Sequence, residues 1–468
     1  MKKLGGIVGD EVTGAKLGDL RLSRRFVTLT EMMAHEPANS FPQACGESSA
    51  ALEGTYRFLN NADVTVDALL EPHRRATIER ATTGEEVLVV HDTTDFTFNG
   101  EREGLGRLQQ HQQGFLAHFA LAVGAGTQHE ALGVVGLLPV FRQKEKVTEH
   151  WRARYRSPDK ESLRWGRLVE TVAADLGQLA AKAIHVMDRE ADSYELFAQL
   201  LKFDRRFVIR ARTDLRKTTD GKPISDAARD VGILATRVVA VTERQARNQG
   251  PRKKANKSRP LAYRPEREAN LEIRACSVTI DTPDRSPISS PLRLNVVHVV
   301  EPRPPEGQDA VDWMLYTSEQ IQSAEDVLKV VDHYRGRWVI EEYFKAIKTG
   351  CGYEKRQLTS RHALLNALAV FIPIAWSLLQ LRQQSRPHPS GETVRPTALT
   401  PQRIQILRAV LKRPLPENPS GRDLLLAVAA LGGHIKNNGD PGWLVLGRGF
   451  QKLLSYEVGW CLAECDQS

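Results

Sequence analysis

The spacing of apolar residues divides the chain into a helical beginning, a strand-rich middle and a helical end. Residues 1–80 have helical spacing, and the two best helix candidates lie at 22–34 and 49–59. Beyond about residue 360 helical spacing returns, broken by a Pro/Ser/Gly-rich linker at 385–396 and by a Pro-rich break at 414–421. The pattern therefore predicts helical domains at both ends of the chain.

The middle of the chain opens with strand patterns. Three β-rich runs, each bounded by glycine or polar residues, lie at 87–98, 115–123 and 131–141. They predict a three-stranded antiparallel meander. Helix, strand, helix and strand patterns then follow in that order at 160–181, 183–187, 191–201 and 206–212. This order predicts a mixed α/β sheet.

Residues 213–315 interrupt this alternation. They contain strand-like pieces at 238–242, 271–280 and 292–300. Nine Lys or Arg residues stand against a single acid between residues 244 and 267. Such a stretch predicts a loop that gains order on a phosphate backbone, with a solvated loop as the alternative. A helix is predicted after this insertion, from about residue 324 to 348.

Composition and charge narrow the possible function. A chain of 468 residues predicts several domains, and a formal net charge of +8 attracts polyanions such as nucleic acid or an anionic membrane. The five cysteines are scattered and form no CxxC pair, which argues against a zinc site or a disulfide framework. The apolar run at 364–381 is interrupted by Asn366, Pro373 and Gln380, so we expect a buried helix and no membrane span. With no apolar signal sequence at the N-terminus, we expect a cytoplasmic protein of a bacterial-type cell.

The predicted helix at 324–348 carries an unusual face. Intervals of three, four, four and three residues align Tyr334, Arg337, Glu341, Lys345 and Lys348. A solvated stripe with a routine Glu341–Lys345 pair would have the same spacing. Two features argue against that alternative. Trp338 lies beside the face, and a separate apolar set provides a core side: Val327, Val331, Val339 and Phe344.

Two aspartates stand on predicted strands. Asp92 interrupts the strand VLVVHDTTDF, where a carboxylate is costly to bury unless it is paired or binds a metal, although an exposed strand end is also open. Asp188 follows the strand AIHVM at its carboxyl end, where α/β sheets place ligands, although an N-cap role is equally open. We expect Asp192 to be a surface residue. Three carboxylates over one end of a sheet would suit hard divalent cations.

These motifs together resemble bacterial insertion-sequence transposases with a DDE triad, in the branch that has a Y-x2-R-x3-E-x6-K signature (the insertion-sequence-four family). Tyr334, Arg337, Glu341 and Lys348 fill that signature. DTTDF at 92–96 and DREAD at 188–192 are similar to the motifs of the first and second aspartates. Segments 17–25 and 48–61 resemble the family's DNA-binding region, and ALGG at 430–433 resembles its dimerisation region.

The resemblance implies an α/β fold: an RNase H-like mixed five-stranded sheet with flanking helices and a β-rich insertion, plus helical N- and C-terminal domains. The implied domains are an N-terminal DNA-binding domain at 1–80, a catalytic domain at 81–365 with its insertion at about 213–315, and a C-terminal dimerisation domain at 366–468.

It also implies cut-and-paste DNA transposition at terminal inverted repeats, by strand nicking, hairpin formation and opening, and strand transfer. The catalytic and metal-binding residues would be Asp92, Asp188 and Glu341, with two Mg²⁺ ions for which Mn²⁺ can substitute. The implied partners are double-stranded DNA and a second copy of the chain in a synaptic homodimer, with no membrane, and the implied location is the nucleoid of the cytoplasm. The candidate DNA-binding residues are Tyr334, Arg337, Lys345, Lys348, Trp313, Arg210, Arg21, Arg24, Arg25 and Arg57.

Two other functions compete with this one. A DNA-binding relic without catalysis would retain the basic regions and lose carboxylates, whereas here all three carboxylates are intact. A structure-selective nuclease would retain the carboxylates and need neither a recognition region nor a dimerisation region.

Overall fold

The protein is described by a computed structural model. The described residues are 7–35, 37–109, 112–142, 160–212, 216–241, 243, 263–283, 286, 288, 290–383, 399–412, 414–435 and 441–466. The chain forms two compact units: unit 1 comprises Met1–Ala183 and Gly336–Ser468, and unit 2 comprises Ile184–Arg335. Each unit contains helices and strands, which confirms the predicted mixed α/β class. The predicted linker at 385–396 and residues 244–262 of the predicted basic loop lie outside the described residues.

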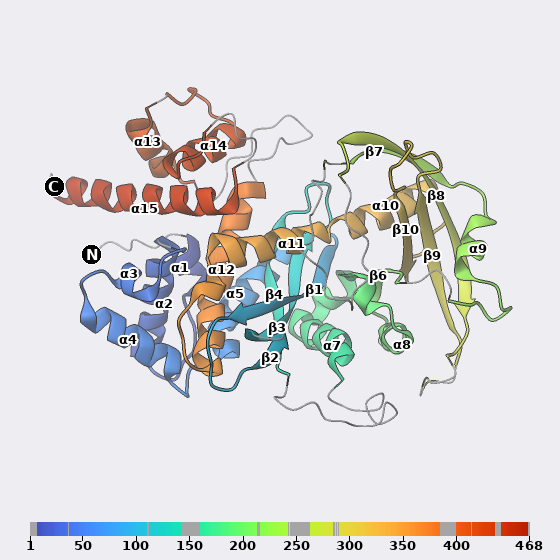
Figure 1. The fold of residues 1–468 in the computed structure, drawn as a ribbon, viewed down its shortest axis with the longest axis horizontal. Coiled ribbons are helices and arrows are strands. Elements are labelled where there is room, and N and C mark those ends of the chain that lie inside the picture. The colour runs from blue at the N-terminus through green and yellow to red at the C-terminus, as the bar shows by residue number, and fades with distance from the viewer. Residues whose placement is uncertain are drawn as a thin grey trace. The chain divides into compact units, whose positions relative to one another are not determined.

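Unit 1 contains an antiparallel sheet centred on β3 (Gln112–Gly124) (Figure 1). β3 pairs with β1 (Val87–Phe98) along the full length of β1, and it also pairs with β4 (Ala131–Val140) and the short β2 (Gly106–Gln109). The predicted three-stranded meander is therefore confirmed. Its register sets Asp92 opposite Phe119, in the middle of β1.

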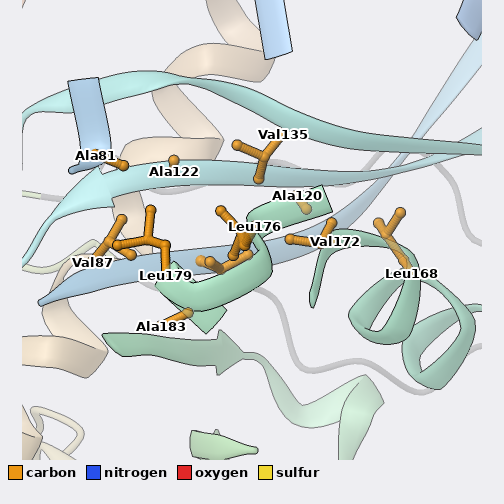
Figure 2. Close-up of a cluster of buried hydrophobic side chains, with 11 residues drawn as sticks. Ala81, Val87, Ala120, Ala122, Val135, Leu168, Val172, Leu176, Leu179 and Ala183 are labelled. Carbon is orange, nitrogen blue, oxygen red and sulfur yellow. The ribbon is translucent and has the colours of Figure 1, made fainter. Parts of the chain in front are cut away.

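The helices that pack on this sheet include α5 (Val66–Ala81) and α7 (Arg164–Leu176). α7 lies between two short 3₁₀ helices, Glu161–Leu163 and Gly177–Lys182. Figure 2 shows the resulting core, in which α7 side chains meet small residues of the strands. The helix contributes Leu168, Val172 and Leu176, and the strands contribute Val87, Ala120, Ala122 and Val135. Burying each Val or Leu stabilises the fold by roughly 1.5–3 kcal/mol, so this core fixes α7 on the sheet.

Gly136 of β4 allows α7 to approach the sheet closely. A Cβ atom at this position would lie 2.7 Å from Val172 Cγ2 and 2.9 Å from Leu168 Cδ1. We expect Gly136→Ala to lower the free energy of unfolding by about 1–3 kcal/mol, because the core must shift to admit the methyl group. Urea unfolding measures this. Gly126→Ala is the matched control, since a Cβ there meets nothing within 4 Å. Equal stability of the two variants would contradict the close approach.

Most other helices of unit 1 come from the two ends of the chain. The N-terminal helices are α1 (Ile7–Val12), α2 (Leu20–His35), α3 (Phe41–Cys45) and α4 (Ser49–Asn60). The C-terminal helices are α12 (Arg361–Gln383), α13 (Pro401–Val410), α14 (Gly421–Leu431) and α15 (Trp443–Asp466). α12 is long and apolar enough to cross a membrane, but 94% of its most apolar window is buried inside the protein. It packs against α2, α4, α5 and β4, which confirms the predicted buried helix at 364–381.

Unit 2 combines a parallel strand pair with an antiparallel extension. β5 (Ala183–Met187) runs parallel to β6 (Arg206–Arg210), and α8 (Tyr194–Lys202) connects them. The order continues through β10 (Asp312–Thr317), β9 (Leu292–Val300), β8 (Arg267–Ile280) and β7 (Ala235–Val241), all antiparallel to their neighbours (Figure 1). The short α9 (Ile224–Arg229) packs on β8 and β9. The predicted strands of the insertion are thus confirmed, whereas β10 was not predicted.

The predicted helix at 324–348 is interrupted. α10 (Ala324–Arg335) ends before Gly336, α11 (Trp338–Lys345) follows, and a π-helical turn, Ala346–Gly350, ends the segment. Glycine has a low helix propensity, which explains why the chain leaves the helix there. Tyr334 consequently belongs to unit 2, whereas Arg337, Glu341, Lys345 and Lys348 belong to unit 1. The prediction of one continuous helical face was wrong.

Candidate active site

Asp92 is a paired, partly buried carboxylate. Its side chain is 17% exposed, and β1 continues for six residues beyond it. Its Oδ1 accepts a hydrogen bond from the backbone N–H of Thr93 (2.7 Å), and its Oδ2 accepts one from Arg337 Nη1 (3.1 Å). The alternative of an exposed aspartate at a strand end is therefore wrong.

Glu341 pairs with the same guanidinium. Arg337 Nη2 donates to Glu341 Oε1, one helical turn later. The Arg337 side chain is only 10% exposed, and its guanidinium lies 5.1 Å from the ring of Trp338, which is exposed. Two of the three predicted catalytic carboxylates thus converge on one buried cation. Lys345, on the same helix, is exposed.

Asp188 lies in unit 2, immediately after the buried strand β5. Its side chain caps the 3₁₀ turn Arg189–Ala191, with Oδ1 accepting from the N–H of Glu190 at 2.9 Å. The capping alternative is therefore correct for the side chain as it stands. A carboxylate oxygen can serve either as a helix cap or as a metal ligand. That Asp188 forms one site with Asp92 and Glu341 stays a prediction.

Asp192 is buried, so its expected place on the surface was wrong. Its side chain is 1% exposed, accepts a hydrogen bond from the N–H of Arg212 (2.8 Å) and pairs with Arg216. Burial lowers the pKa of Arg216, but Asp192 and Tyr316 together raise it by more, and the net pKa is above its ordinary value. This ion pair fixes the chain between η3 and α9 in unit 2.

Three predicted DNA-binding residues lie together in unit 2. Trp313 of β10 contacts Tyr334 edge to face, with ring centroids 5.7 Å apart. The Arg210 guanidinium lies 6.0 Å from the Trp313 ring and donates to the carbonyl of Asp312 (3.3 Å). Tyr334 is almost fully buried, whereas Trp313 is half-buried. β10 therefore presents an indole between a cation and a second aromatic ring.

The other predicted DNA-binding residues lie in unit 1. Lys348 Nζ is 2.9 Å from Asp95 Oδ1. Burial raises the pKa of Asp95, but the hydrogen bond and charge of Lys348 lower it by a larger amount, so the net pKa is below its usual value. Arg21 pairs with Asp19, and Arg57 pairs with Glu53, in exposed positions on α2 and α4. Arg24 is exposed, and the guanidinium of Arg25 lies against Gly54 of α4.

A polar network behind Asp92 was not predicted. The hydroxyl of Thr93 lies 2.9 Å from His118 Nδ1 and accepts a hydrogen bond from Arg164 Nε (2.9 Å). His118 packs against Trp165 and its pKa is well below its ordinary value, because burial and the charge of Arg164 disfavour protonation. The network joins β1, β3 and α7 beside the carboxylate. Its members are far apart in sequence, so no local motif indicates it.

The donor set fits a divalent cation. Asp92 and Glu341 present carboxylate oxygens to one cationic group, and hard divalent ions prefer such oxygens. In the part of the chain that the structure describes, no three His, Cys, Asp or Glu side chains are grouped closely enough to hold an ion. That Asp92 and Glu341 bind a cation therefore stays a prediction.

Two family models match the chain. Residues 6–64 match the model for transposase DNA-binding, and residues 164–372 match the model for the transposase DDE domain. The second match includes Asp188 and Glu341 and begins after Asp92. A DDE domain implies dependence on a divalent metal ion in general.

The chain is also similar to a solved structure described as a piggyBac transposase synaptic complex with hairpin DNA. The TM-score is 0.37 and the sequence identity 11%, over 83% of this chain and 74% of that chain. A similarity this low supports no argument about fold or DNA. The two family matches identify the chain as a DNA-binding enzyme of the DDE transposase class.

Proposed function

We propose that this enzyme catalyses cut-and-paste transposition of an insertion sequence, with Asp92, Asp188 and Glu341 as its catalytic triad. The convergence of Asp92 and Glu341 on Arg337 carries the proposal, because a strand residue and a helix residue 249 positions apart meet around one charge. The signature residues support the insertion-sequence-four branch, and within it the chain most resembles the transposase of transposon five.

The proposed catalytic fold is RNase H-like. Its five strands would be β4, β3 and β1 of unit 1 with the parallel pair β5 and β6 of unit 2, and β7 to β10 would form the insertion. Support comes from the antiparallel meander in one unit and from the parallel pair in the other. Both aspartates then lie on or directly after strands of this sheet, and Glu341 lies on the helix that packs against β1.

Each proposed step is an in-line displacement at phosphorus. Water attacks the phosphodiester at the element's end, and the P–O3′ bond breaks to leave a 3′-hydroxyl. That 3′-hydroxyl attacks a phosphodiester of the opposite strand, whose P–O3′ bond breaks, so that the flanking DNA leaves and the end closes as a hairpin. Water then attacks the hairpin phosphodiester and frees the 3′-hydroxyl again. This hydroxyl attacks a phosphodiester of target DNA and displaces the 3′-oxygen of the target strand. Two Mg²⁺ ions, or Mn²⁺ in their place, held by Asp92, Asp188 and Glu341 would supply activation of the attacking oxygen and stabilisation of the leaving oxygen.

The other site residues would hold DNA. Tyr334, Arg337, Lys345 and Lys348 would bind phosphates near the cleaved bond, where cations contribute affinity without reading sequence. Trp313, flanked by Arg210, would stack on a base expelled during hairpin formation, which is worth about 1–3 kcal/mol per base. Arg21, Arg24, Arg25 and Arg57 would contact the terminal inverted repeats. We propose that a homodimer brings two ends together, on nucleoid DNA in the cytoplasm.

One assay tests this function. Purified protein, Mg²⁺ and a labelled duplex carrying the flanking inverted repeats should release hairpin-ended DNA, which runs as a double-length single strand under denaturing conditions. The control is the same duplex with scrambled repeats. Binding without cleavage would show a protein that has lost catalysis. Nicking without hairpins, on both duplexes, would show a nuclease. Either result would overturn the proposal.

A further inference from the structure

Arg337 is the counter-ion of both carboxylates in the unit 1 part of the site. Separate nitrogens of its guanidinium reach Asp92 Oδ2 (3.1 Å) and Glu341 Oε1. A guanidinium is a rigid fork that stays charged at any physiological pH, so it can bridge two carboxylates as a divalent cation does. In this arrangement Arg337 occupies the position between them.

A metal ion that bridges Asp92 Oδ2 and Glu341 Oε1 would need the same two oxygens. Asp92 Oδ1 already accepts a hydrogen bond from the N–H of Thr93, and Oδ2 faces Arg337. An ion that joins Asp92 to Glu341 therefore has to approach where the guanidinium lies. Because the Arg337 side chain is only 10% exposed, solvent screens its charge poorly, and the two cations repel each other.

We propose that Arg337 and the divalent cation compete for Asp92 and Glu341, and that DNA resolves the competition by drawing Arg337 onto a phosphate. This inference rests on the proposed function, because it assumes that these carboxylates bind the cation. The guanidinium borders the exposed indole of Trp338, so it can leave the carboxylates without crossing the core. A phosphate offers the same forked pairing that it gives up. The DNA-free enzyme then binds the cation weakly, and DNA and cation bind cooperatively.

The test is Mn²⁺ binding to the full-length, DNA-free protein, measured by electron paramagnetic resonance of the free ion. We expect Arg337→Gln to bind Mn²⁺ at least about fivefold more tightly than the wild type, a typical size for coupling between sites. Lys345→Gln is the matched control, because it removes the same charge from an exposed position one turn beyond Glu341. It should change the affinity by less than about twofold, since exposed charges are screened.

Further variants separate this inference from the proposed function. If the double variant Asp92→Asn/Glu341→Gln binds Mn²⁺ as well as the wild type, the carboxylates are not the ligands and the proposed site fails. If the double variant loses Mn²⁺ but Arg337→Gln binds no more tightly than Lys345→Gln, only the competition is overturned. Arg337→Lys retains the charge and loses the fork, so it should lie between the wild type and Arg337→Gln. It also provides a reading should Arg337→Gln fail to fold.

Discussion

Replacing any one of the three proposed catalytic carboxylates by its amide should reduce DNA cleavage at least about 1,000-fold. Asp92→Asn, Asp188→Asn and Glu341→Gln each preserve side-chain size and remove the negative charge that a metal ligand needs. An enzyme whose catalytic residues act as a unit loses most of its rate when one of them is removed, by factors of about 10⁴–10⁶. Single-turnover release of the labelled end, in Mg²⁺ or Mn²⁺, measures the effect.

Two observations make this result specific to catalysis. DNA affinity in a gel shift should persist, because the variants leave the matched DNA-binding region at 6–64 intact. Asp175→Asn is a suitable control, since it removes an exposed carboxylate from α7 in unit 1. A variant of the triad that cleaves at more than about one tenth of the wild-type rate would remove that residue from the site. Asp188 is the most informative of the three, because its joining with the other two is still a prediction.

The strands of unit 1 could be predicted because their signal is local. The run at 87–98 begins fully apolar and then alternates, and the structure has β1 with the same bounds, Val87–Phe98. β10 could not be predicted in this way. It spans six residues and begins with an exposed Asp312. It pairs with β9, the preceding strand in the chain, and with β6, which lies about a hundred residues earlier. Its strand state is decided by tertiary pairing and not by propensity.

The same distinction applies to the site. Spacing placed Arg337 and Glu341 on one helical turn, and the structure has them paired. The same spacing predicts that Tyr334 shares this helical face, but the helix breaks at Gly336, between Tyr334 and Arg337. The spacing of side chains does not show the low helix propensity of a single glycine. The support for Asp92 by Thr93, His118 and Arg164 depends on three separate elements. The types and order of residues therefore indicate the chemistry of the site, whereas the hydrogen-bond network around Asp92 can be identified only from the folded structure.

A second large effect is expected far from the carboxylates, at Glu11. Glu11 of α1 is buried and accepts hydrogen bonds from His73 Nδ1 (2.6 Å) and from Arg80, both on α5. His73 Nε2 in turn accepts from the N–H of Val134 on β4 (3.1 Å), so its proton resides on Nδ1. The Arg80 guanidinium lies 4.3 Å from the ring of Trp376 on α12. One carboxylate thus ties α1, in the segment matched to transposase DNA-binding, to the sheet of unit 1 and to the buried helix α12.

Glu11→Ala should lower the free energy of unfolding by about 3–5 kcal/mol, because it removes the carboxylate partner of a partly buried arginine and leaves a buried imidazole N–H without its acceptor. That is a large part of the roughly 5–15 kcal/mol that stabilises a typical domain. Urea unfolding at pH 7 measures the loss. Glu11→Gln keeps one acceptor and should lose less. Glu47→Ala, at an exposed position in the same region, should change stability by less than about 0.5 kcal/mol.

The Glu11 cluster should also make the fold sensitive to acid in two stages. Burial lowers the pKa of His73 below 6.5, although Glu11 partly opposes this. Below pH 6.5 the unfolded chain therefore binds a proton at His73 that the folded protein does not bind. Stability then falls by up to about 1.4 kcal/mol per pH unit per such histidine. The pKa of His185, which burial lowers to about 3, adds to this stage.

The second stage belongs to Glu11. Burial raises the pKa of Glu11, but hydrogen bonds and charges from His73 and Arg80 lower it more, and the net value is below 4.5. Its contribution is therefore complete above pH 4.5 and is lost as the pH falls through the folded pKa. Unfolding free energies measured from pH 7 to pH 3.5 should show both stages in the wild type. Glu11→Ala should keep the slope below pH 6.5 and lose the additional slope below pH 4.5. An unchanged slope in that lower range would mean that Glu11 is not ionised in the folded protein, and the buried ion pair would then not be what joins α1 to the sheet.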